Sequence, residues 1–356
     1  MIIFSLILCR KRMMKIISEE VQKMQKFGII GMGIRGKMYA NVIKENPCAQ
    51  LNAVCDTNRT ILEQYEKEGI KGYTDFKQMI EQADINVVIV ATPDFMHKES
   101  VIYAATHKLN IMVEKPFSTS VDECKEMSEV IKENKVKCLV AFENRWSLPF
   151  INVKNMIEAG QIGNILNISA MLNDTEYVPR EMLPWAGKST PAWFLFPHII
   201  DMASWYTGKE IKKVYATGVK KKLIKQGLNT YDSIEAIVTY EDDTSGVFTT
   251  TWVLPDTYPV VADQKMNIVG EKSSVNIDLC EQMVKMAASE KFFNPRVLGT
   301  SVNGHLTTPP AHMLNGYIDT LERGLKPLAT EDDGLRNTQI IAAIHKSVEL
   351  GVPIEI

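Results

Sequence analysis

The chain has 356 residues, of which 45% are hydrophobic and 23% are charged, and its formal net charge is −3. This length predicts about two domains with large cores, and the weak net charge argues against a nucleic-acid partner. No apolar stretch approaches the roughly 20 residues that a membrane-spanning helix needs, so no membrane partner is expected.

The first 24 residues need a separate explanation. An apolar run, residues 1–8, precedes the basic residues 10–12, whereas a signal peptide carries its charges before the apolar run. We interpret residues 1–24 as an N-terminal extension, with a membrane-associating leader as the alternative. The cysteines form no C-x-x-C pair and indicate buried thiols in a reducing compartment, so we expect a cytoplasmic protein.

A glycine-rich turn opens the first domain. The apolar run 27–30 ends in G-x-G-x-x-G, and a helix-compatible stretch, residues 37–44, follows. This strand–turn–helix pattern is typical of dinucleotide binding, because the glycines allow a tight turn and close approach of the pyrophosphate. The alternative is a glycine turn without a ligand. The cofactor-binding residues predicted here are Gly31, Met32, Gly33, Ile34, Arg35 and Gly36.

An acidic residue follows the second predicted strand. Asp56 lies twenty positions after Gly36, where a carboxylate can accept hydrogen bonds from the ribose hydroxyls. Its charge favours NAD over NADP, although nearby Arg59 leaves NADP open.

Helices and buried strands alternate as far as residue 145. Helices are predicted over residues 59–68, 74–81, 97–108 and 120–135, and strands over residues 86–91, 110–113 and 137–142. The alternation predicts a doubly wound parallel sheet over residues 25–145, with ligands outside the carboxyl ends of its strands. The residues expected at that edge are Thr92, Pro93, Lys115, Asn144 and Arg145.

The pattern changes after residue 146. We expect a helix over 152–159, a strand over 165–172 and an irregular stretch over 173–191. A helix from Pro197 to Gly208 should follow, with proline at its first position and glycine just past its end. Strands between 214 and 279, with hairpin loops at 241–245 and 270–272, and closing helices over 313–324 and 333–351 predict an α+β domain over 146–356.

Two residues are candidates for proton transfer. Lys115 follows a strand in a predicted cleft and can exchange a proton with a substrate hydroxyl, unless it is an exposed turn lysine. His198 is expected in the first turn of its helix, where the positive dipole end favours neutral imidazole. Asp201, three residues later, either orients this ring or caps the helix. The alternative for His198 is a core position among aromatic residues such as Trp193.

The sequence also bears on His97 and on metal or nucleophile sites. His97 either approaches the cofactor or faces solvent at the start of its helix. No spacing typical of a metal site or of a nucleophilic serine or cysteine is present, so no metal is expected.

These motifs together resemble the glucose–fructose oxidoreductase / inositol dehydrogenase / rhizopine-catabolism (Gfo/Idh/MocA) family over about residues 25–356. The motifs are the glycine turn, Asp56, Ala91-Thr92-Pro93 with His97, Glu114-Lys115-Pro116, Asn144-Arg145 and His198-x-x-Asp201. The resemblance implies a Rossmann domain followed by a domain with a large, mostly antiparallel open sheet, through which members often form dimers or tetramers.

The resemblance also implies an activity. It predicts an NAD- or NADP-dependent oxidoreductase in which Lys115 and His198 flank the reacting carbinol of a sugar, polyol or sugar derivative. It further implies that Glu114, Asn144 and Arg145 contact the cofactor, and that Trp193 and Asp201 contact the substrate.

One position departs from the family pattern. Members commonly have aspartate four residues before the histidine, where this chain has Phe194. The departure leaves room for two other activities. One is an NAD-dependent glycosidase that uses transient oxidation and elimination, and the other is a non-catalytic regulator that only binds the dinucleotide.

Overall fold

The computed structural model describes residues 24–281, 283–295 and 301–356. The predicted N-terminal extension, residues 1–24, therefore lies outside the described residues except for Met24.

The first domain is built on a six-stranded parallel sheet with the strand order β3-β2-β1-β4-β5-β6. The strand order reverses between β1 and β4, which creates a crevice at the carboxyl edge where such sheets bind ligands. The predicted doubly wound sheet is confirmed. Its strands are β1 (Gln25–Ile30), β2 (Ala49–Cys55), β3 (Lys71–Tyr73), β4 (Val87–Val90), β5 (Asn110–Val113) and β6 (Cys138–Val140).

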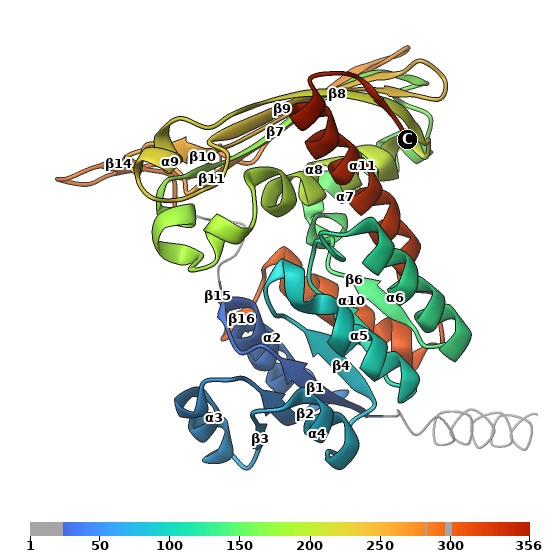
Figure 1. The fold of residues 1–356 in the computed structure, drawn as a ribbon, viewed down its shortest axis with the longest axis vertical. Helices are drawn as coiled ribbons and strands as arrows, with labels where there is room; N and C mark the ends of the chain where they lie inside the picture. Colours follow the sequence, from blue (N-terminus) through green and yellow to red (C-terminus); the bar gives the residue numbers. More distant parts are fainter. Residues whose placement is uncertain (1–23, 282, 296–300) are drawn as a thin grey trace, which may run out of the picture.

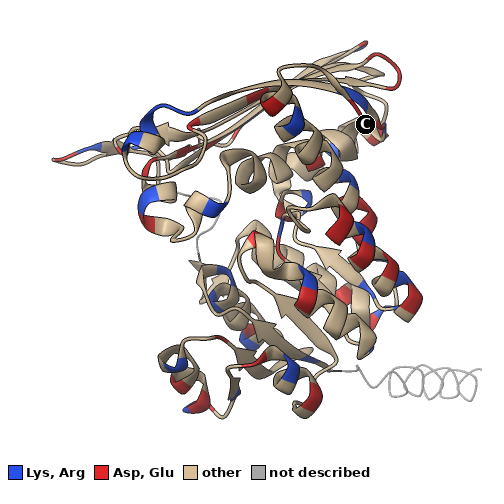
Figure 2. Ribbon diagram, viewed as in Figure 1, with Lys and Arg blue, Asp and Glu red and all other residues tan. Residues whose placement is uncertain are grey.

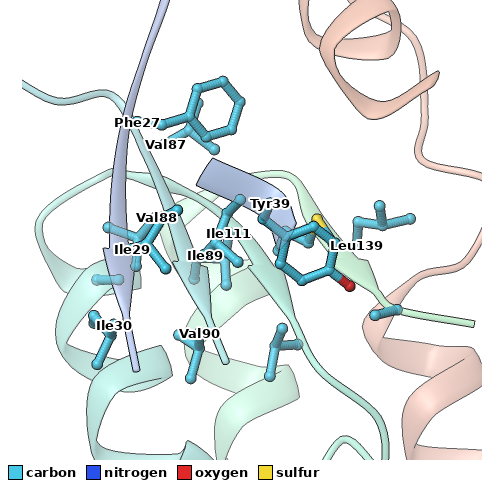
Figure 3. Close-up of a cluster of buried hydrophobic side chains, with 14 of the residues drawn as sticks. Phe27, Ile29, Ile30, Tyr39, Val87, Val88, Ile89, Val90, Ile111 and Leu139 are labelled. Atoms are coloured by element: carbon cyan, nitrogen blue, oxygen red, sulfur yellow. The ribbon is translucent and has the colours of Figure 1, made fainter. Parts of the chain in front are cut away.

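The central strands are buried on both faces because helices cover both. All four residues of β4 are fully buried, which agrees with their continuous apolar, β-branched sequence. Figure 3 shows side chains of β1 and β4 in one cluster with Ile111 of β5, Leu139 of β6 and Tyr39 of the helix after the glycine turn.

The helices of this domain begin close to the predicted positions. The side chains of Asn58, Asp75 and Ser120 each accept a main-chain N–H bond at a helix start, which satisfies one otherwise unpaired donor. The second of these helices was predicted to start at residue 74; it is capped by Asp75 and starts at Phe76. The helices are α2 (Ile34–Glu45), α3 (Arg59–Glu66), α4 (Phe76–Gln82), α5 (His97–Thr106) and α6 (Val121–Asn134), with 3₁₀ turns η1 (Asp94–Met96) and η2 (Glu143–Trp146).

The second domain is built on a seven-stranded sheet with the strand order β12-β11-β7-β10-β9-β8-β17. Only β7 and β10 pair in parallel, so the predicted mostly antiparallel sheet is confirmed. Its strands are β7 (Ile165–Thr175), β8 (Ile211–Val219), β9 (Ser233–Tyr240), β10 (Ser245–Leu254), β11 (Ala262–Gly270), β12 (Ser274–Asp278) and β17 (Ile354–Glu355).

Helices cover one face of this second sheet, as Figure 1 shows for α8 and α11. The helices of this half are α7 (Leu148–Glu158), α8 (Pro191–Thr207), α9 (Lys222–Lys225), α10 (Pro309–Glu322) and α11 (Glu331–Leu350). Short elements complete the described chain: η3 (Val178–Met182), η4 (Ala186–Lys188), β13 (Met286–Ala287), β14 (Phe292–Phe293), β15 (Ser301–Val302) and β16 (His305–Leu306).

The prediction for the start of α8 was wrong. The helix begins at Pro191, six residues before Pro197, and the Thr190 side chain accepts the Trp193 N–H at 3.1 Å. Pro197 lies inside the helix. Pro191 follows a threonine that can cap, whereas Pro197 follows Phe196, which has no capping side chain. The predicted end at Gly208 is confirmed, with φ +65°.

The last part of the chain does not belong wholly to the second domain, contrary to the predicted division at 146. Ala311, Met313, Leu314 and Tyr317 of α10 are part of the core beneath the parallel sheet. The Tyr317 hydroxyl lies 2.9 Å from the main-chain oxygens of both Ile111 and Lys137. The first core is therefore built from two separate stretches of sequence.

Charged residues of both signs alternate along the chain. Figure 2 shows Lys and Arg interspersed with Asp and Glu on the helices of both halves. Within the described residues, no helix combines the length and apolar character that crossing a bilayer requires.

Candidate active site

The glycine turn between β1 and α2 has the shape that a diphosphate requires. Gly31 has φ +90°, and a Cβ there would lie 2.7 Å from the Ala91 oxygen. A Cβ on Gly36 would lie 2.0 Å from the Gly31 oxygen, so neither position accepts a side chain. A Cβ on Gly33 would meet no atom within 4 Å. The turn is thus closed on its inner side and open above Gly33, next to the start of α2.

Asp56 fixes the other side of this turn. Its Oδ2 accepts the Met32 N–H at 2.7 Å, and its Oδ1 accepts the Asn58 N–H at 2.8 Å. The carboxylate is half-buried at the end of β2, and it keeps further lone pairs for ribose hydroxyls. Thr92, at the end of β4, has a buried Oγ1 without a hydrogen-bond partner among the described residues. The open turn, the acid and this unpaired hydroxyl fit a dinucleotide.

The other predicted residues of the turn have different environments. The Met32 side chain is fully buried, whereas Ile34 is exposed. Arg35 Nη2 lies 2.7 Å from Glu143, and its Nε lies 3.6 Å from Glu114. Burial alone would lower the pKa of Arg35, but these carboxylates raise it, so the guanidinium stays charged. Arg35 is therefore held by two acids at the carboxyl edge of the sheet.

Glu114 and Lys115 follow β5 and face different groups. The Tyr39 hydroxyl donates to Glu114 Oε1 at 2.5 Å, which places Glu114 in the packing beneath the turn. Lys115 is 8% exposed, and its Nζ donates to the Phe194 main-chain oxygen at 2.7 Å. The same Nζ lies 4.1 Å from the centre of the Phe194 ring. Lys115 is thus a buried cleft residue that contacts α8, and the alternative of an exposed turn lysine is excluded.

Burial controls the protonation of Lys115. It lowers the pKa of Lys115, while the carboxylates of Glu114, Glu143 and Asp94 partly oppose this and Arg35 reinforces it. A buried lysine with a lowered pKa releases and accepts protons more readily near neutrality than an exposed one.

His198 lies in the middle of α8, not in its first turn as predicted. The dipole argument for a neutral ring therefore fails, because that effect is confined to the first turn. Burial and the positive charges of Lys115 and Arg35 nevertheless hold the pKa of His198 well below its usual range. The Asn144 side chain lies 3.4 Å from the His198 main-chain oxygen and joins η2 to this helix. The structure brings a neutral imidazole into the electrostatic range of Lys115.

Arg145 and Asp201 bind each other rather than facing the crevice. Arg145 Nε and Nη2 donate to the two Asp201 oxygens at 3.0 and 2.7 Å, and both side chains are at most 4% exposed. Arg145 also contacts Asp333, with 3.1 Å between Nη2 and Oδ1, and donates to the Leu328 oxygen at 2.6 Å. The observed contacts hold the two residues in a buried ion-pair network, and their expected roles in cofactor and substrate binding stay predictions.

His97 and Trp193 are also placed by contacts away from Lys115. His97 is 1% exposed, and its Nδ1 and Nε2 lie 3.0 and 3.1 Å from the main-chain oxygens of Pro116 and Thr92. It joins the loops after β4 and β5 and does not face solvent. The Trp193 ring stacks on His345 of α11, with centroids 4.9 Å apart. The substrate contact of Trp193 stays a prediction.

Two buried acids near Lys115 were missed. Asp94 is 4% exposed and accepts the Ser189 hydroxyl at 2.6 Å; burial raises its pKa. Asp174 is 3% exposed at the end of β7, and burial raises its pKa to about 7, with Lys115 partly opposing this. Asp94 follows Thr92-Pro93 at the carboxyl edge and could have been included on that ground. Asp174 lay in the stretch predicted to be irregular, because β7 continues three residues beyond its predicted end.

One group of possible metal ligands occurs in the described residues. Ligand atoms of Asp263, Asp278 and Cys280 lie within 4.8 Å of one another. Lys265 Nζ lies 3.3 Å from Asp278, the Tyr258 hydroxyl donates to Asp263 at 2.7 Å, and burial raises the pKa of the Cys280 thiol. Existing partners and an uncharged thiol make this group a poor cation site.

Comparison with known proteins identifies the family of the chain. A family model described as "Oxidoreductase family, NAD-binding Rossmann fold" matches residues 25–142, and the "GFO/IDH/MocA C-terminal domain" matches residues 150–276. The scyllo-inositol 2-dehydrogenase (NAD(+)) of Bacillus subtilis is 26% identical over 331 residues, covering 92% of this chain and 95% of that protein.

Two other relatives widen the comparison. The 2,7-anhydro-N-acetylneuraminate hydratase of Mediterraneibacter gnavus is 26% identical over 261 residues, covering 72% of this chain and 67% of that protein. The scyllo-inositol dehydrogenase of Lactobacillus casei, solved with bound NAD(H) and scyllo-inositol, has the same fold. It is 22% identical, with a TM-score of 0.81, over 94% of this chain and 99% of that one. The predicted oxidoreductase class and NAD cofactor are confirmed, and the chain belongs to the Gfo/Idh/MocA family of NAD-binding oxidoreductases.

Proposed function

We propose that this protein is an NAD-dependent dehydrogenase that acts on a secondary hydroxyl of a sugar, polyol or sugar derivative. The observation that carries the proposal is the meeting of Lys115, from the end of β5, with α8, which carries His198. The two groups come from different halves of the chain, beside the turn that fits a dinucleotide. The named inositol dehydrogenases among the relatives support a polyol substrate.

The main chain of residues 31–36 would hold the NAD diphosphate, and Asp56 would accept hydrogen bonds from the ribose. When bound, NAD supplies the acceptor for a hydride from the substrate carbinol. The charge of Asp56 repels a 2′-phosphate. Arg59, which could have offset that charge, lies 2.9 Å from Glu66 instead, and this pairing favours NAD over NADP.

Lys115 is the proposed general base for oxidation and general acid for reduction. Its lowered pKa favours the neutral amine that can take the hydroxyl proton, and the Phe194 main-chain oxygen fixes the direction of Nζ. His198 stays neutral and is proposed to share the same hydroxyl through one ring nitrogen. Together they would orient the hydroxyl and move its proton.

A second candidate function is an NAD-dependent elimination or hydration, as in the glycosidase alternative. Its support is the hydratase among the relatives and Phe194 in place of an acid. Such an enzyme would change its substrate without net reduction of the cofactor.

We also propose that the protein forms a homodimer or homotetramer through the uncovered face of its second sheet. Leu166, Tyr215, Ile237 and Val247 are 41–55% exposed on four neighbouring strands, and no helix covers that face in Figure 1. Sedimentation of the purified protein tests this association. Its expected compartment is the cytoplasm, which fractionation of the expressing cells tests.

The function is tested with a panel of inositols, hexoses and sugar derivatives, each mixed with the protein and NAD. Absorbance of the reduced nicotinamide reports dehydrogenation, and chromatography of the substrate reports elimination or hydration. Substrate loss without absorbance change would select the second candidate. Dinucleotide binding with no change in any substrate would favour the non-catalytic regulator.

A further inference from the structure

Asp174 is a buried acid that the proposed reaction does not yet use. It lies next to last in β7, opposite a bulge in β10 where the pairing register shifts between Thr251 and Leu254. Its Oδ2 and the Nε1 of Trp252, a residue within that bulge, both lack a hydrogen bond of normal geometry among the described residues. The polar end of Asp174 is therefore buried, with the Trp252 Nε1–H as its neighbouring donor and no cation beside it among the described residues, which costs free energy.

A short series of contacts connects Asp174 with Lys115. Trp252, whose ring nitrogen faces Asp174, has its ring 5.8 Å from that of Phe194. Phe194 in turn lies against Lys115 Nζ through both its ring and its main-chain oxygen. No ion pair within 4.0 Å joins the lysine and the acid in the described chain. Their interaction is thus electrostatic, across the rings of Trp252 and Phe194, where charges are less screened than in bulk water.

We propose, building on the dehydrogenase function above, that Asp174 is a positioning residue that balances the charge of Lys115 during proton transfer. When the Lys115 amine takes a proton, the new ammonium stabilises the carboxylate form of Asp174, which then releases its own proton. The charge of the buried pair is therefore zero both before and after the transfer.

In the oxidation direction, every proton that is released has an acceptor. The substrate O–H bond breaks and an N–H bond forms on Lys115, giving an ammonium. The O–H bond of the Asp174 carboxylic acid breaks, its electron pair stays on the carboxylate, and water takes the proton. In reduction both steps run in reverse.

Other charged groups surround the pair but have their own partners. Arg35 pairs with Glu143 and approaches Glu114. Asp94 accepts a hydrogen bond from the Ser189 hydroxyl. The positive charge of Lys115 helps to keep His198 neutral. On the side of Asp174, Glu176 pairs with Lys222, and Asp263 accepts a bond from Tyr258. Asp174 alone among these acids has neither a cation nor a hydroxyl donor in the described residues. Its pKa near 7 allows ionisation over the range in which the enzyme would work.

Reciprocal titration tests this inference. The ionisation of Asp174 is followed by the infrared band of its carboxylic acid, assigned by its absence in Asp174→Asn, in wild type and in Lys115→Met. Without the lysine the titration midpoint should rise by about one pH unit or more, because a positive neighbour is lost. In kinetics, Asp174→Asn should move the acid limb of kcat/KM for oxidation to lower pH, and Asp174→Glu should return it toward the wild-type position.

Asp263→Asn is the matched control, since Asp263 is an equally buried acid on the neighbouring strand β11. It should change neither the infrared titration of Asp174 nor the pH profile. An Asp174 band whose midpoint is the same with and without Lys115 would overturn the inference. That titration needs no turnover, so it remains decisive even if the panel of substrates refutes the dehydrogenase function. If Asp174→Asn does not fold, the band is assigned by its shift in Asp174→Glu, and the titration is then compared between wild type and Lys115→Met.

Discussion

Lys115 Nζ contacts Phe194 twice, through a hydrogen bond of 2.7 Å to its main-chain oxygen and across 4.1 Å to the centre of its ring. The two residues come from different halves of the chain, so the position of the proposed base depends on how the halves pack. The hydrogen bond can serve either protonation state of the amine, whereas the ring stabilises only the ammonium.

Replacement of Phe194 by leucine should therefore lower the pKa of Lys115. A cation–π contact contributes about 0.5–2 kcal/mol, which corresponds to at most about one and a half pH units. The acid limb of kcat/KM for oxidation should move to lower pH by that order. Phe292→Leu, at a half-exposed ring in β14, is the control and should leave the profile in place. An unchanged limb in Phe194→Leu would mean that the ring does not influence the lysine.

Replacement of Lys115 by methionine should abolish turnover but spare the dinucleotide. Loss of a general base typically costs 10²- to 10⁴-fold in rate, and the Lys115 Nζ hydrogen bond goes to Phe194 of α8 rather than to the glycine turn. Nicotinamide fluorescence measures binding and absorbance measures turnover. Lys125→Met, on the exposed side of α6, is the matched control and should keep both. Substantial turnover in Lys115→Met would remove the lysine from the mechanism.

Replacement of Gly33 by alanine should weaken NAD binding without unfolding the protein. The added methyl group meets no protein atom within 4 Å, so any cost arises where the diphosphate would approach. We expect at least about a tenfold loss of affinity, or 1.4 kcal/mol, by calorimetry. Gly187→Ala also points into open space and should not change affinity. Equal affinities in the two variants would place the dinucleotide elsewhere.

Replacement of Asp201 by asparagine should destabilise the fold. Removing one partner of a buried ion pair typically costs about 3–5 kcal/mol, because Arg145 keeps its charge without a full set of acceptors. Urea unfolding measures the loss, and Asp319→Asn, from an exposed pair with Arg323, should cost less than about 1 kcal/mol. A higher KM with unchanged stability would instead return Asp201 to the substrate site.

Asp174 should make the stability of the wild type depend on pH. Its pKa is about 7 in the folded state and about 3.9 in the unfolded state, so the unfolded chain releases the proton first as pH rises. Stability from this group is complete below about pH 4 and is lost as pH rises to about 7. The loss is up to about 4 kcal/mol. Relative to Asp174→Asn, the wild type should therefore become less stable over that range in urea titrations at successive pH values.

The sequence predicted the elements whose patterns are local. Val87–Val90 is recognisable as a buried parallel strand, and the glycine turn with Asp56 marks the cofactor side of the site. The predicted start of α8 was wrong because Pro191 and Pro197 both satisfy the preference for proline in a first turn. The threonine cap decided between them, and it shifted His198 to the helix interior.

The partners of charged side chains could not be predicted in the same way. Arg145 and Asp201 are 56 positions apart, and nothing local distinguishes a buried ion pair from two ligand-binding residues. Asp174 was missed for a related reason. Its importance comes from Lys115 and Trp252, which reach it only when the two sheets are in place.

The packing of α10 beneath the parallel sheet bears on how the protein is made. The ribosome releases the strands of the first domain long before it has synthesised Tyr317. The apolar face that α10 covers therefore stays exposed until translation is nearly finished. A premature stop after the second sheet would leave an incomplete first domain, and such a truncated product should be recognised by chaperones and proteases rather than accumulate as a working half.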